Sequence, residues 1–263
     1  MRKNLRKIFV NFIFFPITVL ALVSYIYFSY NPQDFPQSAL AYFEKSQPTG
    51  KIKNSFCEKS KASELNPEFI RAINLAKQRL TEAGTNSTFL EELVDCVEIS
   101  YSTLNYKTSG NKIEGKFEAL EDNSNNLVKI SIDQSYQKKD DLLLAFVLTH
   151  ELIHAKQFFD FQKNWKMKDC IEREVEAFYM ELDLFTALND EERASLLARI
   201  KFGQSPDSTL TSLNQLIKNS IASAEACKKL SEDKLVQCFQ DNNLRSIRNV
   251  LLLNNNYIAQ CNS

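Results

Sequence analysis

The segment from Asp140 to about Phe159 restricts the architecture of this 263-residue chain most strongly. When it is drawn as a helix, apolar residues cover most of its sides. Asp140 and Asp141 stand at its start, where the positive end of the helix dipole favours acidic groups. A helix that is apolar on most sides is stable only when protein covers it. We therefore expect this helix at the centre of a globular domain.

Both histidines of the chain lie in this predicted helix, in the sequence His150-Glu151-Leu152-Ile153-His154. Residues four apart on a helix lie one above the other, so both imidazoles can bind one zinc ion. Glu151 points roughly 100° away from His150, where its carboxylate can take a proton from a zinc-activated water. The motif therefore predicts two metal ligands, His150 and His154, and a general base, Glu151.

The HExxH pattern is short, and it also occurs in helices that bind no metal. The alternative is therefore an ordinary helix whose histidines are surface or core residues. Two observations favour the metal site. The motif uses every histidine in the chain, and it lies in a segment predicted to be a buried helix.

A catalytic zinc site needs a third protein ligand, and the chain has no third histidine. A second helix is predicted from about Cys170 to Leu188, and its apolar stripe must face the core. That stripe consists of Ile171, Val175, Phe178, Leu182 and Phe185. Glu174 borders the stripe, whereas Glu172 and Glu176 point away from it. We expect Glu174 to be the third ligand, with Glu181, one helical repeat later, as the second choice.

These residues resemble the gluzincin pattern, in which a glutamate in an ExxA setting follows HExxH by some twenty residues. Glu174-Val-Glu-Ala177 has that form. Leu148-Thr-His-Glu-Leu-Ile-His-Ala155, followed by Trp165 and Cys170, is similar to the mitochondrial intermembrane-space metallopeptidase family that processes an ATP synthase subunit. The similarity covers about thirty residues. The N-terminal membrane segment and the long helical C-terminus depart from that family. The resemblance therefore implies the zinc ligands and the base, but neither substrate nor compartment.

The resemblance also implies a zincin-like fold, in which an edge strand just before the active-site helix binds the substrate backbone in extended form. Leu127–Asp133 alternates apolar and polar residues and occupies that place in the sequence. We therefore expect it to be the edge strand. A zincin also needs a group besides zinc that stabilises the oxyanion. The candidates, which the sequence does not rank, are Tyr179, Tyr257, Arg245 and Arg248.

The N-terminus carries an uncharged run from Ile8 to Tyr30, which is long enough to cross a bilayer as a helix. Four basic residues precede the run, and this charge orients the N-terminus towards the cytoplasm. A cleaved signal peptide is the competing interpretation, but bulky residues fill the place of a small-x-small cleavage site. We therefore expect residues 1–30 to form a retained single-pass anchor. The catalytic domain would then lie on the periplasmic or extracellular side.

The rest of the chain divides into three predicted parts. Residues 31–61 contain three prolines and many polar residues and should form a linker. Residues 62–205 should form the catalytic domain, with a helix from Asn66-Pro67, a strand within Leu93–Tyr101 and a hairpin turn at Ser109-Gly-Asn111. Residues 206–263 should form two amphipathic helices, about Asp207–Lys229 and Ser231–Asn254, packed on that domain.

All six cysteines follow the N-terminal run. An even number of cysteines in an exported domain indicates disulfides, and buried free thiols are the alternative. Cys227 and Cys238 lie in the two predicted C-terminal helices, close to the turn near Ser231. We therefore expect a disulfide between them.

Composition agrees with a packed globular protein, because 44% of the residues are apolar and 25% are charged. The net charge of -1 provides no basic field that would recruit nucleic acid. We expect an α+β, mostly helical fold, with a zincin-like catalytic domain that has a small mixed sheet and follows one N-terminal transmembrane helix. The expected function is a membrane-anchored zinc metallopeptidase that holds one Zn2+ ion and cleaves a peptide or protein substrate. The alternatives are a non-catalytic zinc-containing membrane protein that binds a partner peptide, and a zinc amide hydrolase that acts on cell-wall material.

Overall fold

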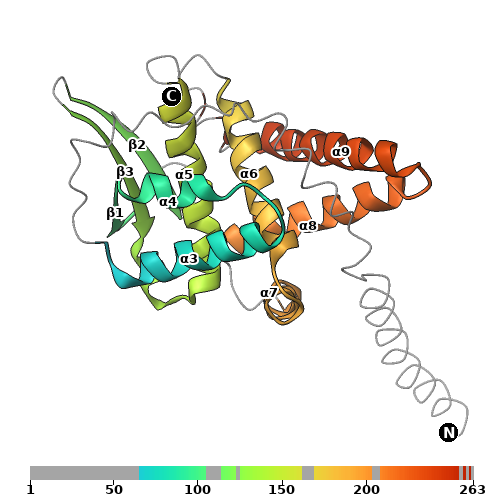
Figure 1. The fold of residues 1–263 in the computed structure, drawn as a ribbon, viewed down its shortest axis with the longest axis horizontal. Helices are drawn as coiled ribbons and strands as arrows, with labels where there is room; N and C mark the ends of the chain where they lie inside the picture. The colour runs from blue at the N-terminus through green and yellow to red at the C-terminus, as the bar shows by residue number, and fades with distance from the viewer. Residues whose placement is uncertain are drawn as a thin grey trace, which may run out of the picture. The chain divides into compact units, whose positions relative to one another are not determined.

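The structure is a computed structural model, and it describes residues 65–104, 114–122, 125–161, 169–202, 208–254, 257–258 and 261 (Figure 1). All of them belong to one compact unit, Gln37–Ser263. The predicted anchor, the linker, the turn at residues 109–111 and Trp165 lie outside the described residues. The predicted domain boundaries stay predictions.

A mixed sheet of three strands, in the order β1-β3-β2, forms one side of the described part of the chain. β3 (Asn125–Asp133) pairs in parallel with β1 (Val97–Ser102) and antiparallel with β2 (Gly115–Asp122). Leu127–Asp133 therefore belongs to the central strand, and the prediction that it is the edge strand is wrong. The parallel partner β1 comes from earlier in the chain and covers the side that the prediction left open. Edge strand β2 pairs with β3 from Gly115↔Ile132 to Asp122↔Asn125.

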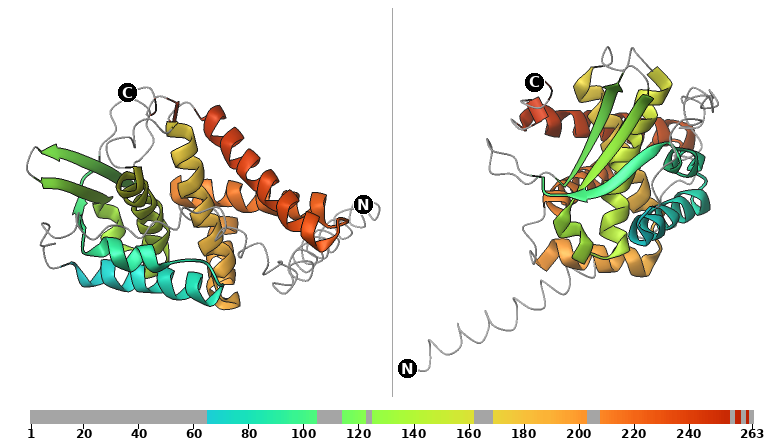
Figure 2. Two further views of the ribbon diagram at one scale, coloured as in Figure 1. Left: turned by 45° about the horizontal axis from the view of Figure 1, so that its top comes forward. Right: turned by 90° about the vertical axis from the view of Figure 1, so that its left-hand side faces the viewer.

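Helix α5 (Asp141–Phe161) contacts β2 and β3 and lies behind the sheet in the right-hand view of Figure 2. A short 3-10 helix, Gln134–Lys138, leads into it from β3. Every residue from Leu142 to Leu148 is buried. Among the described residues, α5 is the one helix long and apolar enough to cross a membrane, and 83% of that apolar stretch is buried inside the protein. It is therefore the central core helix that the sequence predicts.

Two helices precede the first strand in the chain. α3 (Pro67–Glu82) begins as predicted, because the Asn66 side chain accepts a hydrogen bond from the Glu68 amide at 3.0 Å. The chain turns after α3 at Gly84, whose φ of 80° favours glycine. α4 (Thr88–Val94) was not predicted, and it occupies the start of the region expected to be a strand. Only the second half of that region forms β1.

Helix α6 (Cys170–Ala187) packs against α5, α3 and α9. The two C-terminal helices, α8 (Ser208–Cys227) and α9 (Glu232–Leu253), were predicted within a few residues of these bounds. They contact each other and α6 (Figures 1 and 2). The Cys227–Cys238 disulfide joins them and confirms the predicted pair. A second disulfide, Cys170–Cys261, ties the start of α6 to the chain's last residues, and no cysteine among the described residues is free.

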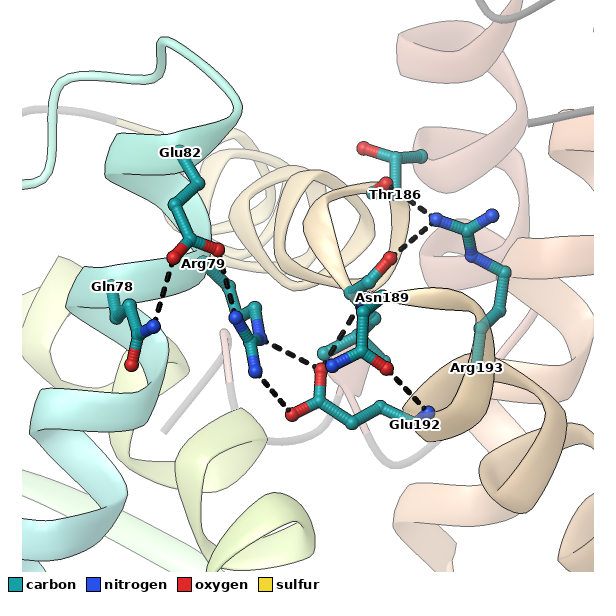
Figure 3. Close-up of polar contacts among 8 residues, drawn as sticks. Gln78, Arg79, Glu82, Thr186, Asn189, Glu192 and Arg193 are labelled. Atoms are coloured by element: carbon teal, nitrogen blue, oxygen red, sulfur yellow. Dashed lines mark hydrogen bonds and ion pairs between the residues drawn. The ribbon is translucent and has the colours of Figure 1, made fainter. Parts of the chain in front are cut away.

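Helix α7 (Asp190–Phe202) was also not predicted, although its start carries a recognisable cap. The Glu192 amide donates to Asn189 Oδ1 at 2.9 Å, and the Asn189 amide donates to Glu192 Oε2 at 3.2 Å. Arg79 of α3 donates to both carboxylate oxygens of Glu192, at 2.8 and 2.9 Å (Figure 3). Arg193 donates to the carbonyl of Thr186 at 3.0 Å (Figure 3). These bonds attach α7 to α3 and to the end of α6.

The described residues are therefore mostly helical with a small mixed sheet, in agreement with the predicted α+β class. The main apolar core lies between the sheet, α3, α4, α5 and one side of α6. A second, smaller cluster lies between α6, α8 and α9. Because α5 and α6 are neighbours in the main core, side chains on their facing sides meet inside the protein.

Candidate metal centre

Three side chains from α5 and α6 converge at a buried point. The Nε2 atoms of His150 and His154 lie 3.2 Å apart. Glu174 Oε2 lies 3.3 Å from His150 Nε2, and Glu174 Oε1 lies 3.4 Å from His154 Nε2. The three residues predicted as metal ligands thus come together, and they form a group that can hold a metal ion.

The spacing of the three donor groups fits a metal with short bonds. Ligands about 2.0–2.1 Å from a tetrahedral zinc ion lie about 3.3–3.4 Å from one another. The two histidine nitrogens lie 3.2 Å apart, and each lies 3.3 or 3.4 Å from a different oxygen of Glu174. Two imidazole nitrogens with one carboxylate also form a donor set typical of a catalytic zinc site.

The outer nitrogens of both histidines are engaged by other side chains. His150 Nδ1 lies 2.7 Å from Glu181 Oε1, and His154 Nδ1 lies 3.1 Å from Gln157 Oε1. Carboxylate and amide oxygens only accept hydrogen bonds here, so each Nδ1 donates. In the neutral imidazoles, the lone pairs are then on the Nε2 atoms, which face the three-residue group.

Glu181 occupies the place of an orienting residue for a ligand. It was the second choice for the third ligand, and its carboxylate lies on the far side of the His150 ring from Glu174. The exposed fraction of both glutamates is 5%. Glu181 is therefore positioned to hold the ring of His150 rather than to join the donor group.

Gln157 is a residue of the site that the sequence reasoning missed. Its amide nitrogen donates to Glu176 Oε2 at 2.7 Å and to the Arg173 carbonyl at 3.1 Å. These two acceptors fix the orientation of the amide, which directs Oε1 at His154. Its position three residues after His154, on the same side of the helix, could have predicted this contact.

The two other glutamates at the start of α6 turn away from the donor group, as predicted. Glu176 is exposed, and its Oε2 accepts a hydrogen bond from Gln157. Glu172 forms a two-bond ion pair with Arg248 of α9, at 2.6 and 2.7 Å. Neither carboxylate belongs to the group that can hold a metal ion.

Glu151, the predicted base, lies directly beneath the start of edge strand β2. It is buried, with an exposed fraction of 7%. A Cβ atom added to Gly115 would stand 2.5 Å from Glu151 Oε1 and 2.7 Å from its Cγ. The strand and the carboxylate are therefore in close contact, and a larger residue at that position would force Glu151 or the strand to shift.

Burial and charge act in opposite directions on the ionisable groups of the site. Burial raises the pKa of Glu151, and the neighbouring His150 and His154 offset only part of that increase. Burial also opposes ionisation of Glu174, but the charge of His154 and the hydrogen bonds from both histidines hold its pKa well below the usual range. Two carboxyl groups of the same type therefore differ in their affinity for protons. This difference is suited to a base and a ligand, respectively.

The four candidates for stabilising an oxyanion occupy different environments. Arg248 is paired with Glu172, and Arg245 is exposed on α9. Tyr179 is buried in the smaller apolar cluster. The Tyr257 ring lies 5.5 Å from the ring of Phe178, which in turn lies 4.7 Å from the ring of His150. Tyr257 is therefore only one aromatic ring away from a ligand histidine.

The chain matches no protein-family model, no curated protein and no solved structure. The likeness to gluzincins accordingly depends on the motif residues alone.

Proposed function

We propose that the chain is a zinc metallopeptidase of the gluzincin type, with His150, His154 and Glu174 as zinc ligands. The observation that carries the proposal is the buried meeting of two histidine nitrogens, 3.2 Å apart, with the Glu174 carboxylate, whose two oxygens lie 3.3 and 3.4 Å from them; a second buried glutamate, Glu151, stands beside this group and is not part of it. When bound, zinc would supply positive charge that polarises the substrate carbonyl and makes water more acidic.

Glu151 would supply the proton transfers. A water molecule attacks the carbonyl carbon of the peptide bond, and Glu151 accepts one of its protons. The same proton then passes to the leaving nitrogen as the carbon–nitrogen bond breaks. The raised pKa of Glu151 suits this role, because a base must also release its proton within the catalytic cycle.

Edge strand β2 supports a peptide as the substrate. One side of β2 pairs with β3, and in the described part of the sheet no strand pairs with its other side. An extended peptide can add to such an edge through backbone hydrogen bonds. Because Gly115 at the start of β2 lies against Glu151, a peptide bound along this edge would bring its backbone close to the base. In a zincin-like fold, β2 would then have the substrate-binding role.

The proposed location is at a membrane, with the catalytic domain on the periplasmic or extracellular side. The charge pattern of residues 1–30 supports this topology, and the two disulfides fit an oxidising compartment. Protease added to intact cells, or to sealed vesicles of known orientation, should digest the domain. Protection of the domain until the cytoplasmic face is opened would contradict this topology.

The test of the proposed reaction is Glu151→Gln. The variant should bind zinc as the parent does and should hydrolyse unfolded protein about 100- to 10,000-fold more slowly, because only the base is lost. Glu174→Ala should lose zinc and activity together, whereas its neighbour variant Glu172→Ala should keep both. Metal analysis and the rate of cleavage are measured on the same preparations.

The outcomes also separate the alternatives. Parent-like hydrolysis by Glu151→Gln would contradict the mechanism. Stoichiometric zinc with turnover of cell-wall material alone would indicate the amide hydrolase. Zinc without turnover of either substrate would indicate the non-catalytic protein that binds a partner peptide.

A further inference from the structure

The Cys170–Cys261 disulfide joins the start of α6 to a residue close to Tyr257 in the sequence. Cys170 begins α6 and stands four residues before Glu174. Cys261 stands four residues after Tyr257. The bond therefore fixes the chain's last residues to the turn of α6 that leads to Glu174. Helix α9 ends at Leu253, four residues before Tyr257.

One aromatic side chain, Phe178, lies between Tyr257 and the donor group. Its ring meets Phe178 edge to face, with centroids 5.5 Å apart. Phe178 meets His150 in the same way, with centroids 4.7 Å apart. Tyr257 is only partly buried, whereas the exposed fraction of Phe178 is 6%. The tyrosine therefore lies at the border between the centre and its surroundings.

The surroundings of Tyr257 keep its hydroxyl protonated. Burial raises the pKa of Tyr257 well above its ordinary value, and the carboxylates of Glu174, Glu181, Glu114 and Glu151 raise it further. Three of these four residues, all except Glu114, lie in or beside the donor group. A tyrosine in this setting is a hydrogen-bond donor throughout the neutral pH range.

We propose that Tyr257 is a catalytic residue whose hydroxyl donates a hydrogen bond to the scissile carbonyl oxygen as that oxygen becomes negative, and that the Cys170–Cys261 disulfide holds it in place. This inference rests on the proposed peptidase function and adds a residue and a structural requirement to it.

The other candidate groups do not supply this hydrogen-bond donor. Both histidines of the chain belong to the donor group, so no imidazole remains to stabilise the oxyanion. Arg248 is held by Glu172, and Tyr179 is buried in the smaller cluster. Loss of one preorganised oxyanion donor typically lowers kcat by about 100- to 1,000-fold. Among the four candidates, Tyr257 is the one whose ring packs against Phe178, the neighbour of the His150 ring.

The first test compares Tyr257→Phe with Tyr179→Phe, because both changes remove only a hydroxyl from a tyrosine near α6. Tyr257→Phe should retain zinc and KM and should lose about 100-fold or more in kcat. Tyr179→Phe should keep the parental kcat. A second measurement is the affinity of the zinc-loaded chains for a phosphinic tripeptide, whose tetrahedral phosphinate carries the negative oxygen. Tyr257→Phe should weaken this affinity at least tenfold, and Tyr179→Phe should not.

The second test concerns the disulfide. The double variant Cys170→Ser/Cys261→Ser should lose as much kcat as Tyr257→Phe, and adding Tyr257→Phe to it should cause little further loss. The matched control is Cys227→Ser/Cys238→Ser, which removes the other disulfide and should keep kcat at temperatures where it remains folded. A full, additive loss in the triple variant would show that the Cys170–Cys261 bond does not act through Tyr257.

Failure of this inference differs from failure of the proposed function. A parent that cleaves peptides while Tyr257→Phe cleaves them equally fast would overturn the inference alone. A zinc-loaded parent that cleaves nothing would overturn the peptidase. In that case the phosphinic tripeptide still tests Tyr257, and equal affinity in parent and Tyr257→Phe would reject its role. A zinc-loaded parent that neither cleaves peptides nor binds the tripeptide would overturn both.

Discussion

Replacing Gly115 with alanine should remove catalysis without removing the metal. The new Cβ atom would stand 2.5 Å from Glu151 Oε1, 2.7 Å from its Cγ and 2.9 Å from its Cδ. Contacts under 3.0 Å essentially never occur and ordinary van der Waals contact begins at 3.4 Å, so the Glu151 side chain or the strand must shift by up to 0.9 Å. The three atoms nearest to the new Cβ all belong to Glu151, so the base should move while zinc stays bound.

The expected loss follows from this displacement. A shift of about 1 Å in a catalytic group can cost roughly 100-fold in rate. Complete loss of a general base costs about 100- to 10,000-fold. Gly115→Ala should therefore reduce kcat by about 100-fold, and Gly115→Ala combined with Glu151→Gln should be hardly slower than Glu151→Gln alone.

The assay measures kcat, zinc content and thermal unfolding for Gly115→Ala beside Gly84→Ala. Gly84 has a φ of 80° but no atom within 4 Å of an added Cβ, so its replacement strains the backbone without touching the site. Gly84→Ala should lower the free energy of unfolding by about 1 kcal/mol and leave kcat unchanged. Parental kcat in Gly115→Ala would refute the reasoning, because it would mean that Glu151 need not occupy the observed position.

Three further predictions concern residues outside the donor group. Glu181→Ala should weaken zinc binding about 10- to 100-fold without abolishing it, because it frees the Nδ1 atom of His150; parental zinc affinity in a chelator competition would contradict this. In the variant Cys227→Ser/Cys238→Ser, the free energy of unfolding measured in urea should be about 3 kcal/mol lower, which is the entropic estimate for a loop of this length. An unchanged unfolding midpoint would count against a disulfide in the native protein. Burial raises the pKa of Asp183 to about 8. Between about pH 4 and 8 the folded chain should therefore hold a proton that the unfolded chain releases. The free energy of unfolding should fall as pH rises, by up to about 1.4 kcal/mol per pH unit, and Asp183→Asn should remove that slope; the same slope in parent and variant would assign it to other groups.

Local periodicity predicted much of the candidate centre. His150 and His154 share a helix face because they are four residues apart, and Glu174 borders the stripe that buries α6. These relations depend only on 3.6 residues per turn and on the need to cover apolar side chains. The Cys227–Cys238 pair was also predictable, since its 11-residue separation spans a single helical turnaround.

Contacts between distant segments decided the rest. Glu174 and Glu181 border the same stripe of α6, and only the way in which α6 packs against α5 places one between two histidines and the other behind His150. The order of the strands depends on the parallel pairing of β1 with β3, which the alternation within Leu127–Asp133 cannot reveal. Tyr257, four residues before a cysteine whose disulfide joins residues 91 positions apart, packs against Phe178 of α6. A sequence pattern reports which face of an element is buried, but the partner of that face is selected by the packing of the whole core.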